Sequence, residues 1–65
     1  MAASPELRAA ALDLLAQLQP VRPHKLIDTL RKQNHVSHRA ANETIFRLMH
    51  EGAIQRTFTG KLKLP

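Results

Sequence analysis

Apolar residues recur at steps of three and four along the first two-thirds of the chain, which is the spacing of one face of a helix. The first stripe consists of Leu7, Ala11, Leu14, Leu15 and Leu18. The segment Ser4–Glu6 precedes it with a capping hydroxyl, a proline suited to the first helical position and an acid that complements the helix dipole. Pro20 and Pro23 then end the helix and impose a short extended segment. The pattern predicts a helix over residues 5–19.

Two further stripes predict helices over residues 24–33 and 37–51. Their apolar faces are Leu26, Ile27 and Leu30 in the second helix, and Ala41, Ile45 and Leu48 in the third. A tight turn separates the two helices, with Asn34 as the residue suited to a left-handed conformation. Ser37 is expected to cap the third helix and Gly52 to close it.

After Gly52 the period changes from helical to alternating, as in a half-exposed strand. The alternating residues are Lys61, Leu62, Lys63 and Leu64. On the preceding strand, Ile54 and Phe58 are expected to share the buried face. Thr59-Gly60 is the turn signal between the strands, so the pattern predicts a hairpin over residues 53–64.

The length of 65 residues indicates one small domain, which buries only about 60% of its extended surface. The chain has no cysteine, so neither a disulfide nor a thiolate metal site stabilises it. No segment approaches the roughly 20 apolar residues of a membrane span, and the start lacks the features of a secretory signal. We therefore expect an intracellular, cytoplasmic protein, associated with the nucleoid if it is prokaryotic.

The positive charge is concentrated in the C-terminal two-thirds of the chain. Residues 1–21 contain one Arg and two acids, whereas residues 22–65 contain nine Lys or Arg and three acids. A one-sided basic field attracts polyanions, and nucleic acid is the first candidate. A merely solubilising basic surface is the alternative that charge alone leaves open.

This order of elements resembles the winged helix-turn-helix family over nearly the whole chain. The matching residues are Val36-Ser37 at the start of the third helix, then Ala41, Ile45 and Leu48, then Gly52 with Ala53-Ile54, and Thr59-Gly60 in the hairpin. The resemblance implies one mainly α domain over residues 1–65, with three helices and a small β-hairpin in the order α-β-α-α-β-β. It also implies binding of double-stranded DNA, with the third helix in the major groove and the hairpin as the wing.

The outward face of the third helix holds the candidate base contacts. At 100° per residue, Arg39, Glu43, Phe46, Arg47 and His50 lie opposite the apolar stripe, and His38 and Asn42 lie at its edge. An Arg can pair with guanine and an Asn with adenine in the major groove. Arg39 and Asn42 are therefore the leading base readers, with His38 beside them. Glu43 either accepts from a cytosine amino group or weakens binding by repelling phosphate.

A further set of residues provides candidate contacts to the DNA backbone, because phosphates are held by basic side chains and by groups near helix starts. The predicted set is Arg22, Lys25, Ser37, Arg47, Arg56, Lys61 and Lys63. Each is individually an ordinary surface residue, but together they would make binding strongly dependent on salt. Phe46 is expected to pack under the wing or against the first helix, with a partner surface or a base contact as the other option.

Catalysis and metal binding find no support in the sequence. There is no nucleophile with a histidine and an acid in a known motif, no paired carboxylates and no glycine-rich phosphate loop. The four histidines lack convergent cysteine or carboxylate ligands for zinc. We expect no enzyme activity, no metal, no cofactor and no small-molecule substrate.

Two function classes therefore remain. The first is a sequence-specific DNA-binding protein, a transcriptional regulator or accessory factor, acting as a homodimer or in a larger complex because one small module binds weakly. The second is a winged-helix adaptor or enzyme inhibitor that uses the same basic face and Phe46 against an acidic protein. RNA binding is disfavoured, because two Phe and no Tyr or Trp give little surface for stacking bases.

Overall fold

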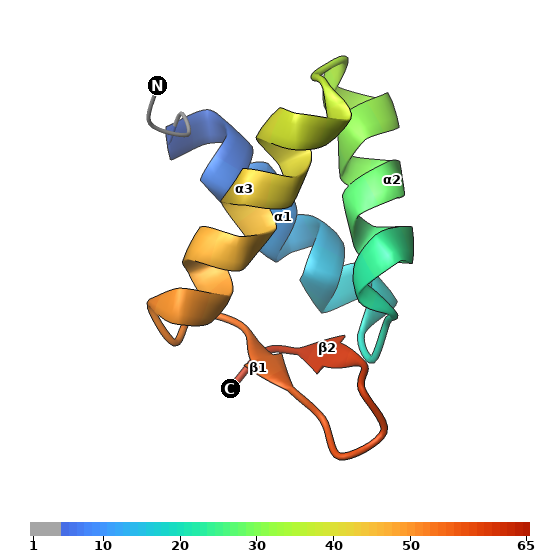
Figure 1. Ribbon diagram of the computed structural model, residues 1–65, viewed down its shortest axis with the longest axis vertical. Helices are drawn as coiled ribbons and strands as arrows, with labels where there is room; N and C mark the ends of the chain where they lie inside the picture. Colours follow the sequence, from blue (N-terminus) through green and yellow to red (C-terminus); the bar gives the residue numbers. More distant parts are fainter. Residues whose placement is uncertain (1–4) are drawn as a thin grey trace.

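The computed structural model describes residues 5–65, and the predicted cap at Ser4 lies outside this range. The chain forms three helices and one hairpin (Figure 1): α1 (Pro5–Leu18), α2 (Pro23–Asn34), α3 (His38–His50), β1 (Gln55–Arg56) and β2 (Leu62–Lys63). Helices α2 and α3 lie side by side, α1 crosses behind α3, and the hairpin closes one end. The three predicted helices are confirmed to within one residue at each end.

One hydrophobic core joins the helices to the hairpin. It consists of Leu7, Ala11, Leu14, Leu15, Val21, Leu26, Ile27, Leu30, Ala41, Ile45, Leu48, Ile54 and Leu62. Every residue of the predicted stripes except the half-buried Leu18 belongs to it, because a stripe at helical spacing must be buried against other elements. Thr44 is the buried polar residue, and its hydroxyl donates to the carbonyl of Ala40 at 2.9 Å.

The turn between α2 and α3 positions the start of α3. Ser37 caps α3 as predicted, since its Oγ accepts from the Ala40 amide at 3.1 Å. The left-handed residue is His35, with φ of 53°, and the prediction of Asn34 for this position was wrong. Asn34 is still helical, and its side-chain amide donates to the carbonyl of Leu30 at 3.1 Å. The helix therefore continues one residue further than the turn signal indicated.

The hairpin is shorter than its alternating pattern suggested. Strands β1 and β2 pair antiparallel with Gln55 opposite Lys63 and Arg56 opposite Leu62. The turn follows at Thr57, whose amide donates to the carbonyl of Lys61 at 2.6 Å. Phe58 lies in this turn with its side chain fully exposed at 106%, so the prediction that it shares the buried face with Ile54 was wrong. Alternation places a side chain only where the strand continues, and here it stops before Phe58.

The extended segment after α1 joins the sheet through one residue. Val21 bridges antiparallel to Leu62, with backbone hydrogen bonds of 3.1 Å and 2.6 Å in the two directions. The predicted short strand is thus reduced to a single bridge residue. Among the described residues, none of the helices has the length and apolarity needed to cross a membrane.

Candidate nucleic-acid interface

The outer face of α3 presents the residues that helical geometry placed there. Arg39, Glu43, Phe46, Arg47 and His50 are exposed, as is His38 in the first turn, while Ala41, Ile45 and Leu48 face the core. Asn42 is half-buried on the flank of α3, where it lines a groove together with Ile27 of α2. The four predicted base contacts therefore occupy the N-terminal half of one accessible helix surface.

Ion pairs divide the basic residues of the described chain into two groups. Arg8 binds Glu51 through two hydrogen bonds of 2.6 Å and 3.0 Å, and Asp28 pairs with Arg31 at 2.9 Å and Lys32 at 3.2 Å. The other Lys and Arg residues of the described chain form no ion pair there: Arg22, Lys25, Arg39, Arg47, Arg56, Lys61 and Lys63. These seven unpaired cations are the Lys and Arg residues that the sequence analysis selected as DNA contacts.

The paired acids are held in their charged form. Hydrogen bonds from Arg8 lower the pKa of Glu51 below its ordinary value, and hydrogen bonds from Arg31 and then Lys32 do the same for Asp28. Glu51 at the end of α3 is thus neutralised by α1. Within the described part of α3, Glu43 is the acid that forms no ion pair.

Three of the unpaired cations come together beside the hairpin. Arg22, Lys25 and Lys61 line one shallow depression of about 310 Å³, between the N-terminal end of α2 and the turn of the hairpin. The Val21–Leu62 bridge holds these two segments against each other. The depression offers two Lys ammonium groups and one guanidinium to an anion, which is suitable for a phosphate contact.

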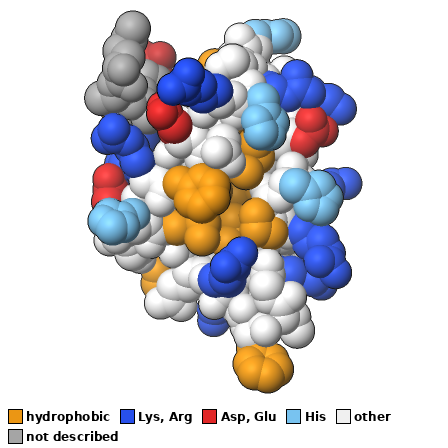
Figure 2. Space-filling model, viewed as in Figure 1, with side chains coloured by type: hydrophobic (Ala, Val, Ile, Leu, Met, Phe, Trp, Pro, Cys, Tyr) orange, Lys and Arg blue, Asp and Glu red, His pale blue; other side chains and the backbone are white. Residues whose placement is uncertain are grey.

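A second, more apolar groove of about 300 Å³ lies between α2 and α3. Its lining comprises Pro23, His24, Ile27, His38, Asn42, Ile45, Phe46, Met49 and Arg56. Figure 2 shows this face: a hydrophobic patch lies over the junction of the two helices, with Lys, Arg and His side chains on several sides of it. The groove brings the predicted contacts His38, Asn42 and Arg56 together. We call it the α2–α3 groove.

Other predicted contacts lie apart from these two depressions. Arg47 lines a different shallow hollow with Phe46, His50 and Glu51. Arg39 and Glu43 are exposed on the α3 surface, and Lys63 is exposed on β2 opposite Gln55. The Ser37 oxygen is engaged as the cap of α3, so only its hydroxyl hydrogen remains for a phosphate.

Phe46 is a second aromatic residue whose environment differs from the prediction. It is 59% exposed, so it is not buried under the hairpin or against α1 as expected. It follows Ile45 directly, so it points about 100° away from the buried stripe. That offset, with Met49 three residues further on the same side, was the available signal for an apolar surface here.

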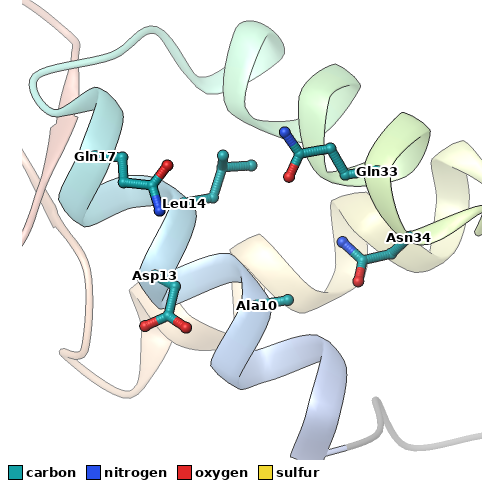
Figure 3. A pocket seen from close by; sticks show the side chains of 6 residues that line it. All are labelled: Ala10, Asp13, Leu14, Gln17, Gln33 and Asn34. Carbon is teal, nitrogen blue, oxygen red and sulfur yellow. The ribbon is translucent and has the colours of Figure 1, made fainter.

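A depression between α1 and α2 is less suited to an anion than the one beside the hairpin. This polar depression of about 240 Å³ is lined by Ala10, Asp13, Leu14, Gln17, Gln33 and Asn34. In Figure 3 the amides of Gln33 and Asn34 point from α2 towards α1, while Asp13 points away from α2. No Lys or Arg lines this depression, and Asp13 adds negative charge near it.

The histidines do not form a metal centre within residues 5–65, where no three His, Asp or Glu side chains are placed to hold a metal ion. His24 and His38 both line the α2–α3 groove, and His24 also borders the depression beside the hairpin. Comparisons of the chain with protein-family models, curated proteins and solved structures found no match.

Proposed function

We propose that the protein binds double-stranded DNA through α3, the N-terminal end of α2 and the hairpin, as a regulator or accessory factor. The observation that supports this most directly is the distribution of unpaired charge. All seven Lys and Arg residues without an acidic partner in the described chain belong to these segments or directly precede α2. A polyanion would be attracted to this surface and away from the α1 side.

In this proposal α3 enters the major groove with its N-terminal half, as recognition helices do. Arg39 and Asn42 read base edges, with His38 and Glu43 beside them. Phosphates on one side meet Arg22, Lys25 and Lys61 in their common depression, and Arg56 and Lys63 extend the contact along the hairpin. A single domain of this size binds weakly, so a dimer on a two-fold site or a larger complex is part of the proposal.

One observation favours a second candidate, an acidic protein partner. The exposed ring of Phe46 and the apolar lining of the α2–α3 groove provide the kind of surface that a protein side chain fills. On this alternative the same cations would pair with carboxylates of the partner. The two candidates differ in whether the isolated chain binds a DNA duplex at low salt.

The test is a fluorescence anisotropy titration of a random-sequence 24-base-pair duplex at several salt concentrations. If the six unpaired cations other than the base reader Arg39 contact phosphates, the slope of log K against log salt is about −5; if half of them do, it is about −3. Lys61→Ala should make the slope less steep by about one, because it removes one phosphate contact.

Lys32→Ala is the matched control for this titration. Lys32 is an exposed lysine that pairs with Asp28, whereas Lys61 is half-buried and forms no ion pair in the described chain. The control should leave the slope of the wild type unchanged. Absence of duplex binding at 50 mM salt, or equal effects of the two substitutions, would refute the proposed DNA surface and leave the acidic protein partner.

A further inference from the structure

The second half of α3 carries an apolar feature that phosphate contacts and hydrogen bonds to bases do not use. Phe46 and Phe58 are the exposed large apolar side chains of the described chain, and they differ in their surroundings. Phe58 lies in the hairpin turn and lines none of the depressions described above. Phe46 borders the α2–α3 groove, where Ile45 and Met49 of α3 and Ile27 of α2 are its neighbours in the lining.

Phe46 follows the predicted base readers along the same helix. His38, Asn42 and Phe46 are spaced four residues apart, so they share one side of α3, and all three line the α2–α3 groove. Four residues advance a helix by about 6 Å, and base pairs are stacked about 3.4 Å apart. Side chains at this spacing therefore meet base pairs one or two steps apart in a groove that the helix follows.

The charges around Phe46 restrict what can cover it. Arg47 is adjacent in sequence, Arg56 shares the groove with the ring, and neither forms an ion pair in the described chain. Glu51, which shares a shallow hollow with the ring, is already paired with Arg8, so a ligand that presents an apolar group flanked by negative charge suits this surface. The major groove supplies this combination where a thymine 5-methyl group projects between two rows of phosphates.

We propose that Phe46 is a specificity-determining residue that contacts thymine methyl groups, so that this surface prefers A·T base pairs. The inference rests on the proposed DNA binding and deepens it. Asn42 supports the same preference, because its amide is suited to adenine N6 and N7, which the A·T pair presents in the same groove as the methyl group. A G·C pair offers neither the methyl group nor this donor and acceptor pattern.

The test compares two duplexes that differ only in the methyl group. One 24-base-pair duplex contains A·T pairs in random order, and the other replaces every thymine with uracil. Burial of one methyl group corresponds to about a fourfold change in affinity at 25 °C. The wild type should therefore bind the thymine duplex about fourfold more tightly for each methyl group that the ring covers.

Three variants test whether Phe46 causes the preference for the thymine duplex. Phe46→Ala should lower the ratio of the two affinities to about one, and Phe46→Leu should retain part of it because an apolar contact remains. Phe58→Ala, which removes the other exposed ring, should keep the wild-type ratio. Circular dichroism of each variant verifies that the helices are intact before its ratio is used.

The outcomes separate this inference from the proposed function. Equal binding of both duplexes by the wild type, or an unchanged ratio in Phe46→Ala, would overturn the role of Phe46 while DNA binding stands. Binding of neither duplex at 50 mM salt would overturn both. The inference would also fail if an amphipathic helical peptide with leucine on one face and glutamate on the other bound more tightly than either duplex and was lost in Phe46→Ala.

Discussion

Replacing Leu62 with alanine tests whether the hairpin belongs to the core. Leu62 is 0% exposed, and it packs with the helices while its backbone bridges to Val21. Leu→Ala removes three carbon atoms, and the lost burial with the cavity left behind costs about 2–5 kcal/mol. A chain of 65 residues has a free energy of unfolding of about 3–10 kcal/mol. The single substitution should therefore remove a large part of the total stability.

Urea denaturation followed by far-ultraviolet circular dichroism measures this loss. With a slope of about 1 kcal/mol per molar urea for a small domain, the midpoint of Leu62→Ala should fall by at least about 2 M. Phe58→Ala is the control: because Phe58 is fully exposed, its loss should leave the free energy of unfolding within about 0.5 kcal/mol of the wild type. A loss below about 1 kcal/mol for Leu62→Ala would mean that the hairpin does not contribute to the core.

Three further predictions concern backbone, capping and charge. Gly60→Ala should lower the free energy of unfolding, measured by urea denaturation, by about 1–2 kcal/mol. The cause is the backbone φ of +84° at Gly60, because the space around the added Cβ is open. Ser37→Ala should lower the free energy of unfolding by about 1 kcal/mol, because it removes the cap of α3. Ser37→Asp should not lower it, because Asp also caps helices. Glu51→Gln should lower Tm at neutral pH. Because Arg8 lowers the pKa of Glu51 below 4.5, the wild type loses this stabilisation as pH falls through the lowered value, so the two Tm values should converge in acid.

The sequence predicted the helices well because each one buries a continuous stripe. Leu26, Ile27 and Leu30 in α2 are all buried, and nothing outside the helix period was needed to place them. The hairpin was predicted less well, because its strands end where the Thr57 turn begins and because Val21 joins it from 41 positions away. Neither feature is visible in a local alternation of apolar and polar residues.

In the candidate site, too, local features could be predicted from the sequence and features that depend on the tertiary fold could not. The exposed cations of α3 could be predicted because each lies opposite a buried stripe. The neutralisation of Arg8 could not be predicted, since the Arg8–Glu51 pair joins residues 43 positions apart and depends on how α1 crosses α3. Arg31 and Lys32, in contrast, pair with Asp28 at the local helical spacings of three and four residues. The exposure of Phe46 could also have been predicted, because its position about 100° from the buried stripe turns the ring towards solvent.

The Val21–Leu62 bridge has a consequence for the order in which the chain folds. The turn between α2 and α3 needs only neighbouring residues, whereas the bridge closes a loop of about forty residues before it gains two hydrogen bonds. We therefore expect the helices to form first and the sheet to close last, which makes the bridge the slow, non-local step of folding. In the native state the amides of Val21 and Leu62 should then exchange with solvent through detachment of the hairpin, at a lower free energy than the amides in the middle of α3.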